Sequence, residues 1–204
     1  MAKKGLSKLV TADYSFDGTK VSYTNPVNNE KMAEYSVDIE VSDPNDLYLD
    51  NGVAETDGGE FVSGTLNLTT GDLSNETSKA FYHLKEEEIT YAKGKTAKEY
   101  VWDDSMQFAE KGVGIIEEHQ VNNETFYRGI WFARVKFNIP SDSATTRGQN
   151  IDWKTQELTG AMLRSQDDGH RWKSHADFET EAEALEYLMF KGGKAVETTE
   201  AGEA

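Results

Sequence analysis

The sequence has no cysteine and only three prolines among its 204 residues. Without cysteine the chain can form no disulfide, and it offers no thiol for catalysis or metal binding. It also has no apolar run approaching the roughly 18 residues of a membrane-spanning helix, and no run of signal-peptide length near its N-terminus. We therefore expect a protein that stays in the cytoplasm where it is made.

Basic residues are scarce, because 21 Lys and Arg face 37 Asp and Glu and leave a net charge of -16. The field around such a protein repels phosphate, which argues against a nucleic-acid binder that works by counterion release. It is compatible with a surface that must avoid adhering to DNA. The length predicts one β domain at 1–190, followed by a disordered acidic tail at 191–204 with almost no apolar side chains.

The motifs of a catalytic or metal site are also missing. There is no G-x-S-x-G elbow, and the acidic pairs Asp103-Asp104 and Glu117-Glu118 are adjacent, so on a strand their carboxylates would point to opposite faces. His170 and His175 follow no metal-binding spacing and are interpreted as solvent-facing. We therefore expect no enzyme, no metal and no cofactor.

Three patterns admit both a ligand-binding and a structural interpretation. The acidic loop 43–52 has Tyr48 where a calcium loop needs an oxygen ligand, which favours a plain polar loop. Gly112-Val-Gly114 has two glycines of a dinucleotide fingerprint, but a strand-like sequence follows, which favours a bulge or a close crossing. Four tryptophans could form a sugar-stacking platform, although in a β-rich domain most serve as core: Trp102, Trp131, Trp153 and Trp172.

Period-two alternation dominates what is present and predicts strands at 34–41, 62–68 and 130–139. In the first, one face is acidic and the other is expected to be buried, with Tyr35, Val37, Ile39 and Val41. Dipeptides that tolerate positive φ predict hairpins at Asp17-Gly18, Asn51-Gly52, Asn122-Asn123 and Asp168-Gly169. The last two would pair 112–121 with 125–138 and 161–166 with 171–176.

Two helices are expected beside these strands. An apolar stripe predicts one from about 74 to 84, placed to cover a sheet. Thr180 and Glu183 form a capping box that begins the second, which should bury Ala184, Leu185 and Leu188 and end near Gly192-Gly193. The charged stretch 86–99 is interpreted as an exposed connection. The residues alone thus predict a mainly β, antiparallel domain with one or two flanking helices.

The hairpin around Asn51-Gly52 carries apolar residues in a stretch otherwise rich in Asp, Asn and Gly. This pattern fits a protruding arm that offers a partner surface, and it fits equally a hairpin that folds back onto its own domain.

Several short segments form an ordered series along the chain. They are GLSKLVTA at 5–12, SVDIE at 36–40, LYLDNG at 47–52, GTLNLT at 64–69, GVGI at 112–115, ARVKF at 133–137, PSD at 140–142, TTRG at 145–148 and TQELTG at 155–160. No segment is specific by itself. Their order and spacing over most of residues 5 to 160 resemble the major tail proteins, or tail tube proteins, of long, flexible-tailed bacteriophages of Gram-positive hosts.

The resemblance implies a structural virion protein whose fold is a pair of packed antiparallel sheets, sandwich- or barrel-like, with a flanking helix. Such chains assemble as hexameric rings that stack into a hollow tube, through which DNA passes into the host. The implied partners are other copies of the chain, a tape measure protein, and tail initiator and terminator proteins. DNA would pass without specific binding, no membrane is involved, and the expected location is the phage tail, assembled in the host cytoplasm.

In such a ring, six copies of a chain with net charge -16 would carry -96, and an acidic inner wall would repel DNA. The candidate lumen-facing residues are Glu34, Asp38 and Glu40, with an outward orientation left open. The candidate inter-subunit hairpin comprises Leu47, Tyr48, Leu49, Asp50, Asn51, Gly52 and Val53. The alternative function is a small acidic binding protein, either a DNA mimic or a carbohydrate-binding β module.

Overall fold

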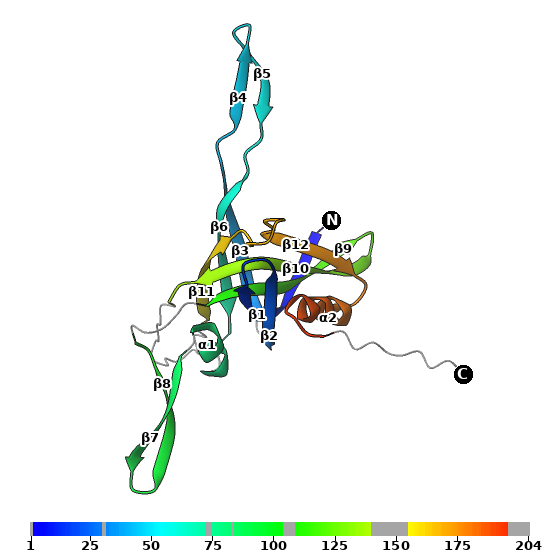
Figure 1. Cartoon of the computed structure of the whole chain (residues 1–204). Coiled ribbons are helices and arrows are strands. Elements are labelled where there is room, and N and C mark those ends of the chain that lie inside the picture. The colour runs from blue at the N-terminus through cyan, green and yellow to red at the C-terminus, as the bar shows by residue number, and fades with distance from the viewer. Residues whose placement is uncertain are drawn as a thin grey trace, which may run out of the picture.

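The computed structural model describes residues 2–29, 32–71, 75–82, 84–103, 109–139 and 155–195. Within these ranges the chain is mainly β (Figure 1). The strands are β1 (Ala2–Phe16), β2 (Val21–Asn29), β3 (Met32–Val41), β4 (Asn45–Leu49), β5 (Gly52–Asp57), β6 (Phe61–Thr70), β7 (Lys85–Ala92), β8 (Lys95–Val101), β9 (Glu110–Val121), β10 (Glu124–Phe137), β11 (Gln156–Leu163) and β12 (Lys173–Phe178). The helices are α1 (Asn75–Tyr82) and α2 (Glu181–Lys191).

Eight strands form one antiparallel sheet in the order β2-β1-β9-β10-β11-β6-β3, with β12 paired to β10 beside this path. Strand β10 pairs with β9 along one edge, while its other edge is divided between β12, at 127–132, and β11, at 134–137. The sheet branches at this point, and β11, β6 and β3 fold over the other strands. The result is the expected pair of packed antiparallel layers.

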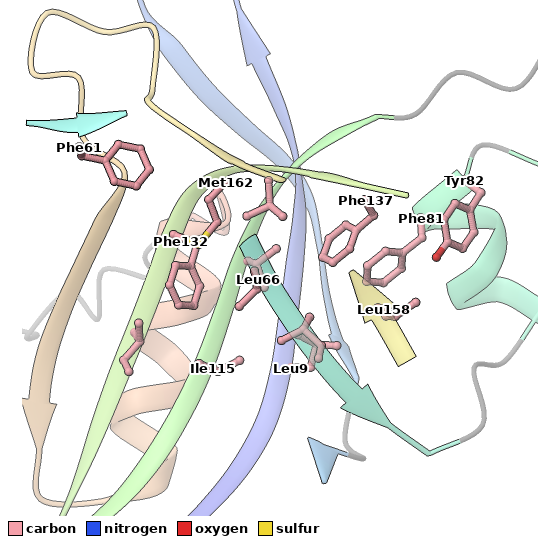
Figure 2. Close-up of a cluster of buried hydrophobic side chains, with 14 of the residues drawn as sticks. Leu9, Phe61, Leu66, Phe81, Tyr82, Ile115, Phe132, Phe137, Leu158 and Met162 are labelled. Carbon is pink, nitrogen blue, oxygen red and sulfur yellow. The ribbon is translucent and has the colours of Figure 1, made fainter. Parts of the chain in front are cut away.

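The core lies between these layers. Leu66 of β6 and Leu158 of β11 face Leu9, Ile115 and Phe132 of the opposite layer, and all five side chains are buried (Figure 2). The buried Phe81 and Tyr82 of α1 extend the same core, so the first predicted helix does cover the sheet. Removing these side chains from water supplies most of the stability of the body.

Helix α2 covers the opposite face of the β1–β9–β10 layer. Its Leu188 packs with Ile116 and Trp131, and a Cβ atom at Gly114 would lie 2.9 Å from the Leu188 side chain. Gly114 of β9 therefore permits a close contact between helix and sheet. This agrees with the interpretation of Gly112-Val-Gly114 as glycines at a close crossing. The capping box is also confirmed, because the backbone N–H of Glu183 donates to the Thr180 hydroxyl at 3.2 Å.

Hairpins form at three of the four predicted positions and join β1–β2, β4–β5 and β9–β10. The turns at Asp17-Gly18 and Asn122-Asn123 are confirmed, whereas the predicted Asn51-Gly52 turn lies one residue earlier, at Asp50-Asn51, because Leu49 pairs with Gly52. A turn also forms at Asp168-Gly169, where the His170 N–H donates to the Asp167 carbonyl at 3.0 Å. The predicted pairing of 161–166 with 171–176 is wrong, however, since β12 pairs with β10 and not with β11. Both edges of β11 are already occupied, by β10 and by β6. Strand β12 instead takes the free part of the β10 edge.

Two other expectations need correction. The stretch 86–99 is not a connection but a second hairpin, β7–β8, which turns at Gly94 with φ +70°. In β3 the predicted buried face is only partly so: Tyr35 and Val37 are half-buried, but Ile39 and Val41 are 45% and 62% exposed. The strand has passed the end of the core by this point.

The boundary predicted between the domain and its tail, at residues 190 and 191, falls at the end of α2. Lys191 is the last residue of α2, and the following Gly192 is buried against Pro26 and Ala12 of the body. The rest of the predicted tail, 196–204, lies outside the described residues.

Candidate functional site

The described residues offer little site chemistry. No group of three or more His, Asp or Glu side chains among them could hold a metal ion, and His170 and His175 are exposed. Of the tryptophans, Trp131 is buried in the core and Trp172 stacks on Phe61, whereas Trp102 is 47% exposed. Trp153 lies outside the described residues. In the part of the chain that is described, no helix has the length and apolarity needed to cross a membrane.

One buried polar cluster was missed by the sequence analysis. Glu117 and His119 are each 3% exposed on the inner face of β9, and the Glu117 carboxylate lies 2.8 Å from Nε2 of His119. Lys3 Nζ lies 2.5 Å from the same carboxylate, and the Tyr35 hydroxyl donates to it. Because these residues come from β1, β3 and β9, the cluster ties the two layers together.

Protonation in this cluster follows from its contacts. Burial acts to raise the pKa of Glu117, but donors from Lys3, Tyr35 and His119 outweigh it, and the pKa is lowered. Burial, followed by the hydrogen bond to Glu117, raises the pKa of Tyr35 to about 12. The contacts of Glu117 are with side chains that come from three strands of the body, and we interpret the cluster as structural. The only signal in the sequence is that the apolar alternation at Val113 and Ile115 continues into two polar residues.

The three predicted acidic residues lie together on an exposed sheet face. Glu34, Asp38 and Glu40 of β3 pair with Thr69, Thr65 and Ser63 of β6, so these side chains share one face. All three acidic residues are exposed. The face continues onto β11, where Glu157 pairs with Thr69. We call the outward side of β3, β6 and β11 the acidic face.

The acidic face is short of positive charge and rich in hydroxyl groups. Its three strands contain no Lys or Arg, and Lys136 of β10 borders it beside Ala161. Polar side chains bridge the strands: Thr159 donates to Asn67 at 2.9 Å, and Ser63 donates to Glu40 at 2.6 Å. The face therefore combines polar side chains with net negative charge.

The sheet has open edges at both ends of its strand order and along β12. β2 and β3 stand at the two ends of the order, β12 pairs only with β10, and no described strand pairs with the outer edges of these three strands. Unpaired N–H and C=O groups on such edges are a template for pairing with another chain.

Between β3 and β6 the chain extends as a long arm, residues 43–60, which contains the hairpin β4–β5 and projects from the body (Figure 1). Its base is held by a 2.8 Å hydrogen bond from the Ser42 N–H to the Glu60 carbonyl. The predicted contact residues lie on it, with exposed fractions from 51% to 64%: Leu47, Tyr48, Leu49 and Val53. The arm does not fold back onto its own domain.

The second hairpin, β7–β8, projects from the other end of the body (Figure 1). A cleft of about 580 Å³ lies at its base, between α1, β1 and β2. The charged residues that line it are Asp13, Lys79, Glu86, Lys98 and Lys111. No sequence signal indicated this cleft, because its lining comes from six segments that only the fold brings together.

No protein-family model matches the chain, and no curated protein matches it. Its function must therefore be argued from the surfaces described above.

Proposed function

We propose that this chain is the tail tube protein of a long-tailed bacteriophage, a structural protein that self-assembles into stacked hexameric rings for DNA passage. The observation that carries the proposal is the combination of open strand edges and an exposed apolar arm on one polar, acidic body. Each of these features is left unsatisfied in a single copy, and a second copy of the chain can satisfy each.

The open edges support the ring. Since β2 and β3 end the same sheet, an edge-to-edge contact between successive copies uses two different surfaces. Such a heterologous contact closes into a ring when the rotation between copies permits it. Closure would pair the backbone groups that a single copy leaves open.

The acidic face supports the role as a conduit. With Glu34, Asp38 and Glu40 turned toward the centre of the ring, DNA would meet carboxylates and hydroxyl groups and no cation on these three strands. Carboxylates repel the phosphate backbone, so DNA can slide without adhering. The tape measure, initiator and terminator proteins are the further partners that this assembly requires.

The competing function is a DNA mimic, which the same acidic face favours, because rows of carboxylates can occupy the basic surface of a DNA-binding protein. A mimic acts as a discrete particle. A carbohydrate-binding platform has less support, since Trp131 is buried and Trp172 is stacked on Phe61.

Sedimentation velocity over a wide range of concentrations separates these functions. A tube protein gives species that grow with concentration, first to rings and then to polymers. A DNA mimic stays a small particle of constant size at every concentration and binds a basic DNA-binding protein in the same experiment. That second result would overturn the proposed function.

A further inference from the structure

The tip of the 43–60 arm contains the one Asn-Gly pair of the sequence, Asn51-Gly52. Every residue from 47 to 60 is exposed, so water reaches both members of the pair. The backbone nitrogen that follows an asparagine can close a five-membered ring on the side-chain carbonyl of that asparagine. Glycine favours this attack because it has no Cβ atom to obstruct the approach. The tip of the arm therefore holds the groups needed for a reaction of the chain with itself.

A turn in the body offers a matched comparison. Asp50 and Asn51 have φ values of +51° and +62°, and Asn122 and Asn123, between β9 and β10, have +50° and +68°. The two turns thus share one left-handed backbone conformation. They differ in the residue that follows, because Asn123 precedes Glu124, which has a side chain beside the attacking nitrogen.

The two turns also differ in how firmly they are held. The hairpin β4–β5 projects from the body as a sheet of two strands, and no other described strand pairs with it (Figure 1). Such an isolated pair of strands is marginally stable in water and opens locally. In the body, Gln120 pairs with Thr125 across the hairpin and with Ala2 of β1 on its other side. Because Gly52 is paired with Leu49 in the closed arm turn, the reaction depends on this local opening.

We propose that Asn51 is a site of spontaneous deamidation on the folded chain, with aspartate and isoaspartate as products. Hydroxide removes the proton of the Gly52 N–H, and this nitrogen attacks Cγ of Asn51. The N–Cγ bond forms, the Cγ–Nδ2 bond breaks, and Nδ2 takes a proton from water and leaves as ammonia. Water then opens the cyclic imide. Cleavage of the new N–Cγ bond gives aspartate, whereas cleavage of the original peptide bond gives isoaspartate, in which the main chain runs through Cγ.

Both products change the arm and leave the body as it is. Each adds a carboxylate to a segment that already has six carboxylate residues and no Lys or Arg. Isoaspartate also lengthens the main chain by a carbon atom, which a two-residue turn does not accommodate in its present register. This inference does not depend on the proposed function.

Peptide mapping of the folded protein by mass spectrometry, with an assay for isoaspartate, tests the proposal. After incubation at neutral and at mildly alkaline pH, Asn51 should be converted several-fold faster than Asn122 and Asn123. Conversion should be faster at the higher pH, because the reaction begins with the loss of a proton. Conversion of Asn51 no faster than that of the two body asparagines would overturn the proposal.

Two variants separate the contributions of sequence and structure. Gly52→Ala should keep the turn, since apart from its chain neighbours the nearest atom to the new Cβ would be the Leu49 carbonyl oxygen at 3.8 Å, and conversion should slow several-fold. Glu124→Gly places an Asn-Gly pair in the anchored body turn, where Asn123 should react more slowly than Asn51. Unchanged conversion in Gly52→Ala would overturn the proposed ring closure. Equal rates for the two Asn-Gly pairs would overturn the part assigned to opening of the arm.

Discussion

Strands β9 and β5 are both members of antiparallel hairpins, yet they lie in opposite environments. Residues 111–117 of β9 are all buried, whereas all six residues of β5 are exposed. Burial of apolar side chains accounts for the stability of the body, whereas the apolar side chains of the 43–60 arm are exposed and do not hold the arm against the body. Apolar side chains kept in water on such an arm gain free energy only when a partner covers them. The body thus supplies the stability of the fold, and the proposed function gives the arm its role in assembly.

The largest effect on the free energy of unfolding is expected from a substitution in the buried core of the body. Trp131→Ala removes a 1%-exposed side chain from the contact between β10 and α2. We expect a loss of about 3–5 kcal/mol in the free energy of unfolding, measured by urea denaturation. Tyr48→Ala, a 64%-exposed aromatic on the arm, is the matched control and should change it by less than about 0.5 kcal/mol. Similar losses for the two variants would contradict the division.

Alkaline pH tests the body through its tyrosines. Burial raises the pKa of Tyr23, Tyr35 and Tyr82 to about 12, from an ordinary value of about 10. The folded state thus holds these protons more tightly than the unfolded state, so stability is full below about pH 10 and falls as pH rises toward 12.

Absorbance titration of the phenolate measures this effect. Tyr23, Tyr35 and Tyr82 should form their phenolates only as pH rises toward 12. Tyr35→Phe should retain the body fold and remove one late-ionising group. Ionisation of these three tyrosines near pH 10, with the protein still folded, would contradict the environments described above.

Replacing 46–56 by a short Gly-Ser turn tests the arm. Because the arm adds nothing to the core, the free energy of unfolding should change by less than about 1 kcal/mol, the size of a loop-closure effect. Polymerisation should be lost. Normal tubes from the shortened chain would show that the arm has no part in assembly.

A small effect on stability is also expected on the acidic face. Asp38→Lys with Glu40→Lys changes two exposed side chains and should alter the free energy of unfolding by under about 1 kcal/mol. Tubes should still form, but DNA ejection from assembled virions should slow at low salt and recover as salt screens the attraction. Ejection at the unchanged rate in low salt would place these carboxylates outside the channel.

Local patterns were enough to predict much of the fold. Alternation located β3, β6 and β10, turn dipeptides located three hairpins, one of them to within one residue, and Thr180 with Glu183 located the start of α2. These signals depend only on neighbours in the chain. The acidic residues proposed for the channel and the apolar residues proposed for subunit contacts are exposed, as their local patterns predicted.

What failed depends on distant contacts. The turn at Asp168-Gly169 has the right chemistry for a hairpin, but the pairing of β12 was decided by which edge of β10 was free. Exposure of Ile39 depends on where the opposite layer ends. The Glu117 cluster and the lysine-bearing cleft each need strands that lie far apart in the sequence, so no local pattern could reveal them.

Negative-stain electron microscopy of the concentrated protein tests the central claim, self-assembly into a hollow tube, most directly. We expect rings and tubes of one uniform diameter with a stain-filled channel, formed by the unchanged chain and absent from the chain shortened at 46–56. Isolated particles at every concentration, even with tail initiator proteins added, would contradict the claim.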